Sequence, residues 1–147
     1  EDIGSAVGWV NEILPENKPR HLLGIGEPLD ILDGIRAGCD TFDCVSPTRK
    51  ARNGSLYTRE GEINILNAIH KESKDKVDET CDCYTCKNFT RGYLAHLFRS
   101  KEILASTLAS IHNLRFVIRL TEEAREAILN DNFDQFADQF KKDFSKD

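Results

Sequence analysis

Three cysteines lie within six residues of this 147-residue chain, as Cys81, Cys83 and Cys86, and a histidine, His112, follows on an expected helix. Thiolates spaced as Cys-x-Cys-x-x-Cys can converge on one ion with little ordering of the chain between them, and a distant fourth ligand then ties a helix to that turn. A Cys₃His set closes a tetrahedral zinc site and leaves no open position. The spacing therefore predicts a structural zinc ion (Zn2+).

The alternative is that these residues are ordinary thiols or disulfide partners. The chain has five cysteines, the other two being Cys39 and Cys44, and an odd number leaves one unpaired in any disulfide framework. We find no signal-like segment before the first expected helix and no apolar stretch of roughly 18 residues. We therefore expect a cytoplasmic protein with reduced thiols and no membrane segment.

Asp43 is a carboxylate inside the short apolar run Thr41–Val45. An ionised group there is costly unless it is paired or lies where a strand ends at a cleft. The segment Thr48–Arg52, which we expect to be a loop, follows and carries three cations in four residues. This pattern predicts a nucleophile or base beside a bound polyanion. A carboxylate that caps the nearby turn, or that pairs with Arg49 or Arg52, explains the position nearly as well.

The overall charge is −5, which argues against a protein that coats nucleic acid unselectively and makes the basic segment a local exception. The Gly-Ile-Gly turn at 24–26 precedes an expected helix start and invites a phosphate-binding interpretation. It lacks the third glycine of dinucleotide loops, so a tight turn is the simpler interpretation. The remaining histidines show no partner spacing and are interpreted as surface or packing residues: His21, His70 and His96.

The elements that must position these residues begin with a helix over residues 5–14. Two apolar runs, His21–Gly26 and Thr41–Val45, flank a helical pattern that starts at Pro28 and ends at Gly38. A strand, a helix and a strand with connections of this length predict a βαβ unit with parallel strands. We expect Asp43 near the carboxyl end of its strand, where α/β proteins place their sites.

The pattern changes after Gly54. A β-hairpin with glycine at its turn is expected over residues 55–65, followed by a polar loop over 71–80. Thr90 is expected to cap a helix with apolar residues as far as Leu108, and a second apolar-periodic run extends from Ile111 to Ile128. A last helix carries a phenylalanine stripe that belongs to a core or an interface: Phe133, Phe136, Phe140 and Phe144.

A family resemblance rests on three motifs in order. Residues 42–54 read FDCVSPTRKARNG, the cysteine motif reads CDCYTC, and the histidine begins His-Asn-Leu. Together they resemble tRNA-guanine transglycosylase (queuine tRNA-ribosyltransferase) of the bacterial type, from about His21 to Phe144. The resemblance implies an α/β fold, the C-terminal part of a (β/α)8 TIM barrel with an inserted zinc-binding α+β subdomain. It divides the chain into 1–53 (last barrel elements), 54–115 (zinc subdomain) and 116–147 (helices packing back on the barrel).

The function implied is that of a pentosyltransferase that exchanges guanine at the wobble position of a tRNA anticodon loop for a 7-deazaguanine precursor of queuosine. Asp43 matches the family's nucleophile, and Cys81, Cys83, Cys86 and His112 match its zinc ligands. The family uses no nucleotide or redox cofactor and forms homodimers around the zinc subdomain. Residues that match its RNA-contacting stretches are Gly24, Ile25, Gly26, Glu27, Pro28, Leu29, Asp30, Thr48, Arg49, Lys50, Ala51 and Arg52.

The resemblance also implies that part of the active site lies elsewhere. The family's base pocket and a second aspartate lie on earlier barrel strands, and the chain starts at Glu1, so we expect a piece of a longer protein that is inactive alone. A second interpretation is a non-catalytic zinc-containing module for tRNA binding or assembly. A third is a purely structural zinc module.

Overall fold

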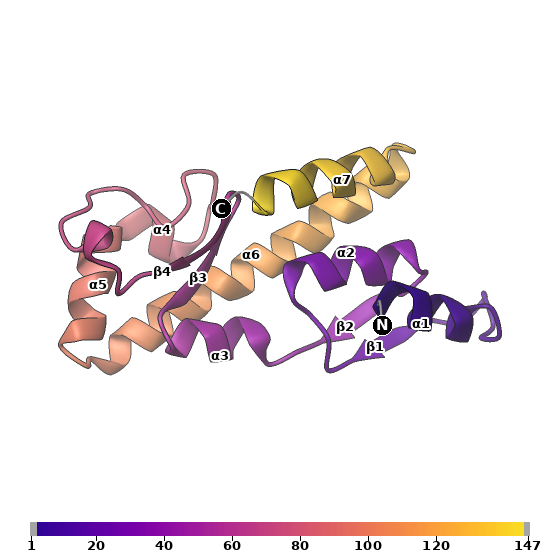
Figure 1. Ribbon diagram of the computed structural model, residues 1–147, viewed down its shortest axis with the longest axis horizontal. Coiled ribbons are helices and arrows are strands. Elements are labelled where there is room, and N and C mark those ends of the chain that lie inside the picture. Colours follow the sequence, from indigo (N-terminus) through magenta and orange to yellow (C-terminus); the bar gives the residue numbers. More distant parts are fainter. Residues whose placement is uncertain (1–2, 146–147) are drawn as a thin grey trace.

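The computed structural model describes residues 3–145 and shows a mixed helix and strand fold (Figure 1). The elements follow in the order α1 (Ile3–Asn11), β1 (His21–Leu23), α2 (Pro28–Arg36), β2 (Thr41–Asp43), α3 (Ser46–Arg52), β3 (Ser55–Thr58), β4 (Gly61–Asn64), the 3₁₀ turn η1 (Ala68–His70), α4 (Tyr84–Asn88), α5 (Arg91–Arg99), α6 (Ile103–Leu129) and α7 (Phe133–Phe144). No helix in residues 3–145 has the length and apolar character needed to cross a bilayer.

The expected βαβ unit is confirmed, because β1 and β2 pair in parallel with His21 opposite Thr41. Helix α2 connects them; it has proline in its first turn, and Gly38 (φ 93°) follows its end. Both strands are shorter than expected. Gly24, with φ 73°, turns the chain after β1, and Val45 already has helical backbone angles after β2. Asp43 is therefore the last residue of its strand.

The expected loop at Thr48–Arg52 is wrong, because these residues form α3. Proline near the start of a helix has a backbone angle that suits it and lacks an N–H that would go unused there. Arginine, lysine and alanine are then strong helix formers. The consequence is that the three cations point in different directions around a helix.

The hairpin is confirmed, with Ser55 opposite Asn64 and Gly61 at φ 122° beside the turn. The expectation of a single helix from Thr90 to Leu108 is wrong, because the helix is interrupted at Lys101 (φ 58°), between α5 and α6. No glycine or proline marks that break. Thr90 does cap α5, since its Oγ1 accepts the N–H of Tyr93 at 3.2 Å.

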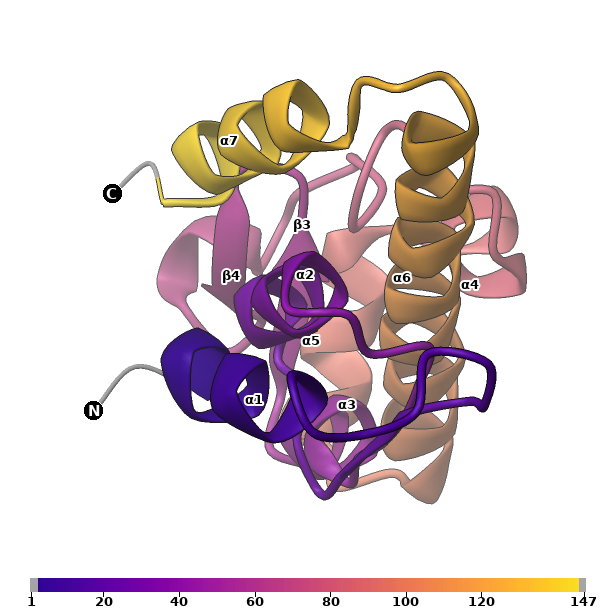
Figure 2. The same ribbon diagram turned by 90° about the vertical axis from the view of Figure 1, so that its right-hand side faces the viewer.

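Helix α6, 27 residues long, holds the two ends of the molecule together. It runs from the α4 and α5 end to the α2 and α7 end, and Figure 2 shows it upright beside the other elements. One core lies on the hairpin side and includes Leu56, Leu94 and Leu108. A second core joins α2, α6 and α7 around Phe116 and Phe140. The phenylalanine stripe of α7 therefore faces this second core.

Candidate functional site

The four residues expected to bind zinc lie together. The ligand atoms of Cys81, Cys83, Cys86 and His112 are within 4.8 Å of one another, and all four residues are buried. His112 Nδ1 is 3.3 Å from Cys86 Sγ and 3.7 Å from Cys83 Sγ. A zinc tetrahedron with a Zn–S bond of about 2.3 Å and a Zn–N bond of about 2.1 Å has an S···N edge of about 3.6 Å. The donor set and its spacing fit a closed zinc site.

The local structure of the cysteine turn brings its thiols inward. Cys83 caps α4, and its Sγ accepts the backbone N–H of Cys86 at 3.3 Å. Hydrogen bonds from the neighbouring thiols of Cys81 and Cys86 lower the pKa of Cys83, whereas the thiols of Cys81 and Cys83 raise the pKa of Cys86. All five cysteines are free thiols. Crowded thiols of this kind favour a bound dication, which stabilises their anionic forms together.

The helix ligand is oriented by the hairpin. His112 Nε2 donates a hydrogen bond to the backbone carbonyl of Tyr57 at 2.7 Å, which leaves Nδ1 as the nitrogen that faces the thiols. The next residue, Asn113, accepts the N–H of Tyr57 at 3.1 Å and donates to the carbonyls of Ser55 and Pro47 at 3.0 Å each. Since alternate residues of an antiparallel strand direct their backbone groups away from the partner strand, α6 satisfies the free edge of β3.

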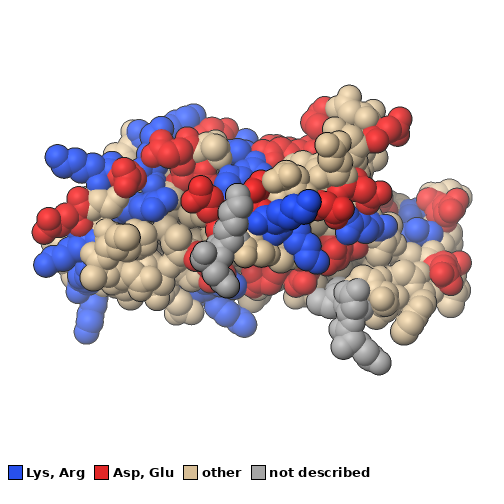
Figure 3. All heavy atoms as spheres, turned by 45° about the horizontal axis from the view of Figure 1, so that its top comes forward, with Lys and Arg blue, Asp and Glu red and all other residues tan. Residues whose placement is uncertain are grey.

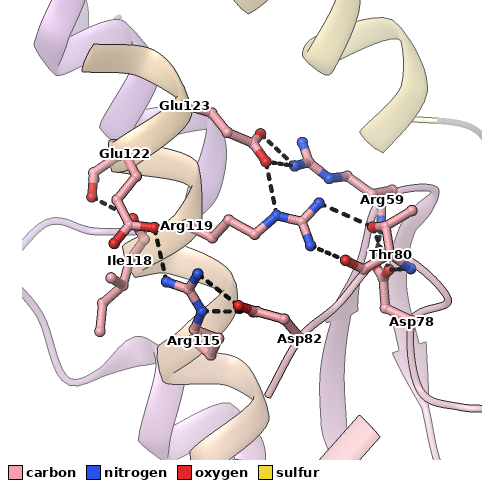
Figure 4. Close-up of polar contacts among 10 residues, drawn as sticks. Arg59, Asp78, Thr80, Asp82, Arg115, Ile118, Arg119, Glu122 and Glu123 are labelled. Atoms are coloured by element: carbon pink, nitrogen blue, oxygen red, sulfur yellow. Dashed lines mark hydrogen bonds and ion pairs between the residues drawn. The ribbon is translucent and has the colours of Figure 1, made fainter. Parts of the chain in front are cut away.

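Two arginines on α6 hold the start of the cysteine turn and the residue before it (Figure 4). Arg115 donates to both carboxylate oxygens of Asp82, at 2.7 and 3.0 Å, and to Glu122 at 2.8 Å. Arg119, one turn further on, donates to the carbonyl and hydroxyl of Thr80. A bidentate guanidinium pair fixes geometry as well as charge. Sequence reasoning missed these arginines, although their spacing with Glu122 along one helix is a detectable charge pattern.

The network continues to the hairpin turn. Glu123 accepts from Arg119 at 2.8 Å and also from Arg59. Although burial raises the pKa of Glu123, the hydrogen bonds from the two arginines lower it overall. Asp78 accepts the backbone N–H groups of Arg59 and Thr80, at 2.9 and 2.8 Å. This side-chain network thus joins the metal-binding turn, the hairpin and α6, in addition to the contacts among the four candidate zinc ligands.

Asp43 lies apart from the zinc cluster, at the end of β2, with 62% of its side chain exposed. Its Oδ1 accepts the backbone N–H of Gly24 at 3.1 Å and lies 3.1 Å from Nε2 of His21. The Gly24 amide and then His21 lower the pKa of Asp43, so the carboxylate is ionised at neutral pH. It is paired with neither Arg49 nor Arg52 among the described contacts. Sequence reasoning missed His21, which lies opposite Thr41 on the neighbouring strand.

A cavity of about 680 Å³ opens beside Asp43. Its walls come from β2, α2 and α6, and most of the lining is apolar: Ile35, Phe42, Leu114, Val117, Ile118 and Ile128. The polar group at the strand end therefore borders an apolar hollow, which is the usual composition of a ligand or docking site.

The turn at 24–26 is pressed against the strand that carries Asp43. A Cβ at Gly26 would lie 2.5 Å from Cys44 Cβ, so only glycine fits there. Glu27 accepts from the Tyr57 hydroxyl at 3.0 Å and lies 3.2 Å from the Lys50 ammonium. The other residues of this stretch range from exposed to buried: Gly24 is exposed, Ile25, Leu29 and Asp30 are half-buried, and Gly26 and Pro28 are buried.

The cations of α3 have different environments. Arg49 and Arg52 are exposed and form no ion pair with another residue in the described part of the chain. Lys50 is paired with Glu62 at 2.6 Å and Glu27 at 3.2 Å, and it lies over the Tyr57 ring. Of the other two residues of the segment, Ala51 is fully buried, and Thr48 donates to the carbonyl of Val45. On the face in Figure 3, acidic and basic side chains are intermixed.

The fold and site define a mixed α/β protein in which a βαβ unit is joined by a long helix to a Cys₃His metal-binding region. Comparison with known proteins identifies it further. The model of the family "Queuine tRNA-ribosyltransferase" matches residues 1–146, and the chain belongs to this family. The resemblance inferred from the motifs is confirmed, and the buried Cys₃His cluster is consistent with the structural zinc of the family.

Individual relatives agree. A queuine tRNA-ribosyltransferase of Herpetosiphon aurantiacus is 53% identical over 132 residues, which cover 90% of this chain and 34% of that protein. One from a Thermoanaerobacter species is 51% identical over 138 residues, covering 94% of this chain and 37% of the relative. One from Vibrio vulnificus is 54% identical over 127 residues, covering 86% and 34%. The chain thus spans about a third of the length of the relatives it matches.

Proposed function

We propose that this chain is the C-terminal part of a tRNA-guanine transglycosylase that replaces the anticodon wobble guanine by a 7-deazaguanine precursor of queuosine. The observation that carries the proposal is the placement of Asp43. It is an exposed, ionised carboxylate at the carboxyl end of a parallel strand. It lies beside an apolar cavity and three residues before the start of α3, in which Arg49 and Arg52 form no ion pair with another described residue.

In the proposed reaction, Asp43 is the nucleophile. A carboxylate oxygen forms a bond to C1′ of the ribose while the C1′–N bond to guanine breaks, and the electron pair leaves with the base. The departing guanine takes its proton from a carboxylic acid, which we assign to the part of the parent enzyme outside this chain. The incoming deazaguanine then loses a proton and displaces the carboxylate, so two inversions restore the original configuration at C1′.

The fold of the parent is proposed to be a (β/α)8 barrel in which β1 and β2 are the last two strands. Support comes from the two-stranded sheet, which is small for an independent parallel sheet, and from apolar side chains exposed near it. Trp9, Ile13 and Leu23 are 66%, 86% and 76% exposed. In this proposal residues 1–53 complete the barrel, 54–115 form the zinc subdomain, and 116–147 pack back on the barrel.

The RNA-contacting surface is proposed to comprise Gly24–Asp30 and Thr48–Arg52. Within it Arg49 and Arg52 are the cations open to phosphate, since exposed arginines form bidentate contacts with phosphate oxygens. Lys50 already has two carboxylate partners, so its contribution is to hold α3 against the hairpin and the start of α2. These assignments predict salt-dependent binding of a tRNA anticodon loop.

Zinc, held by Cys81, Cys83, Cys86 and His112, stabilises the subdomain through its bonds to three thiolates and an imidazole. We also propose that the parent is a cytoplasmic homodimer joined near this subdomain, where Tyr84 is 58% exposed. The chain alone is proposed to be inactive, because it lacks a free second carboxylic acid beside Asp43 among its described residues. The two other carboxylates that line the cavity already have partners: Asp40 accepts the backbone N–H of Arg20, and Glu122 is paired with Arg115.

The test uses the full-length parent enzyme with the Asp43→Asn substitution. Incubation with tRNA and denaturing electrophoresis should show a covalent protein–RNA band for the wild type and none for the variant, while both bind tRNA with similar affinity. Asp40→Asn, at a carboxylate that lines the same cavity, is the matched control and should keep the band. A band of normal intensity from Asp43→Asn would refute the role of Asp43, and no band from the wild type would favour a non-catalytic binding module.

A further inference from the structure

The two oxygens of the Asp43 carboxylate have different surroundings. Oδ1 accepts the N–H of Gly24 at 3.1 Å and lies 3.1 Å from Nε2 of His21. Both hydrogen bonds to this carboxylate from other described residues are made to Oδ1. One oxygen is therefore held, and Oδ2 is left to meet a ligand.

The strand pairing explains how His21 reaches the carboxylate. Thr41 and Asp43 are two residues apart on β2, so their side chains lie on the same face of the strand. On β1, His21 is in register with Thr41 of β2, and its ring lies between the side chains of Thr41 and Asp43. Three side chains from two strands thus form a row: hydroxyl, imidazole and carboxylate.

The chemistry of the row determines the tautomer of the imidazole. An ionised carboxylate only accepts hydrogen bonds, so Nε2 of His21 must carry the proton that faces Asp43. In the neutral ring, Nδ1 is then an acceptor, and the hydroxyl of Thr41, 2.8 Å away, is the group that donates to it.

The other titratable or charged groups near Asp43 do not compete for Oδ1. Asp40, Glu122, Arg125 and Cys44 line the same cavity. Asp40 accepts the backbone N–H of Arg20, and Glu122 is paired with Arg115. The carboxylate of Asp43 is therefore oriented by His21 and the Gly24 amide.

We propose that His21 is a positioning residue: with its tautomer set by Thr41, it holds Oδ1 of Asp43 together with the Gly24 amide, so that Oδ2 is presented for attack. The catalytic consequence rests on the proposed function of Asp43, whereas the hydrogen-bonded row itself does not. A nucleophile held by two donors keeps one orientation, and small misplacements of reacting groups are costly to rate.

The primary experiment uses the 147-residue chain and needs neither RNA nor catalysis. Carboxyl carbons of ¹³C-labelled aspartate are titrated by NMR, and long-range ¹⁵N–¹H spectra report the tautomer of each histidine. His21 should be the Nε2–H tautomer. His21→Phe should raise the pKa of Asp43 towards the ordinary aspartate value, and Thr41→Val should increase the Nδ1–H form of His21.

Two further variants separate orientation from packing. His21→Gln keeps an N–H donor near the position of Nε2 and should leave the pKa of Asp43 closer to the wild-type value than His21→Phe does. His96→Phe, at an exposed histidine on α5, is the matched control and should leave the pKa of Asp43 unchanged. If His21→Phe does not fold, the tautomer in the wild type and the comparison of His21→Gln with Thr41→Val still decide the question.

An Nδ1–H tautomer in the wild type, or an Asp43 pKa that is the same in folded His21→Phe as in the wild type, would overturn the proposal. In the full-length parent, His21→Phe should lower kcat by roughly 10-fold or more with little change in KM for tRNA. If the NMR results hold but covalent trapping fails in the wild-type parent, the row of side chains stands and the proposed function of Asp43 fails.

Discussion

Replacing Asn113 by alanine should strongly lower the free energy of unfolding, although the substitution removes only a polar side chain. Asn113 is fully buried on α6 and makes three hydrogen bonds, one with the N–H of Tyr57 and two with the carbonyls of Ser55 and Pro47. A buried hydrogen bond contributes about 1 kcal/mol net, and more when its partner is left unsatisfied. The variant should therefore lose about 3 kcal/mol of unfolding free energy.

The assay is urea unfolding of the zinc-saturated chain, followed by circular dichroism. With an m-value of about 2 kcal/mol/M, a loss of this size lowers the unfolding midpoint by about 1.5 M. Asn130→Ala is the control, because its amide is exposed and donates only to the carbonyl of Glu126 within the end of the same helix. If Asn113→Ala shifts the midpoint no more than Asn130→Ala does, the view that α6 satisfies the free edge of β3 is wrong.

Two further predictions concern the zinc cluster and the arginine network. Metal analysis should find one zinc per chain, and Cys86→Ser should release zinc to a colorimetric chelator faster than a control variant does. The control is Ser106→Ala, at a half-buried residue of α6 that is not one of the four candidate ligands. Equal release rates would contradict the ligand assignment. Glu123→Gln should remove stabilisation that depends on pH, because a carboxyl whose folded pKa is lowered stabilises the protein above its unfolded pKa and loses that contribution as pH falls through the folded pKa. The urea midpoints of wild type and Glu123→Gln should therefore differ at pH 6 and converge well below pH ~4.3, and a constant difference would count against the pairing with Arg59 and Arg119.

The boundaries of the βαβ unit could be predicted wherever a residue with a strong local preference marks them. Pro28 starts α2 and Gly38 follows its end, as expected, since each suits its position through its own backbone geometry. The basic segment was harder to interpret. A short run of charged residues reads as a solvated loop, and its helical form depends on Pro47 and on packing of the buried Ala51.

The break at Lys101 could not be predicted, because the left-handed backbone between α5 and α6 occurs at a lysine and no glycine marks the position. The role of His21 was missed for a similar reason. Its proximity to Asp43 depends on the register of two strands that are separated by a helix, and sequence spacing does not specify register.

The sequence by itself determined the family and the candidate zinc ligands, because cysteine and histidine spacing and long ordered motifs carry that information in residue types. Only the tertiary structure decided which groups surround those residues. It placed His21 and Gly24 on one oxygen of Asp43, gave Lys50 two carboxylate partners, and joined the cysteine turn to α6 through Arg115 and Arg119. These contacts join residues that are distant in the chain, so they depend on strand register and helix packing, which appear only when the whole chain is folded.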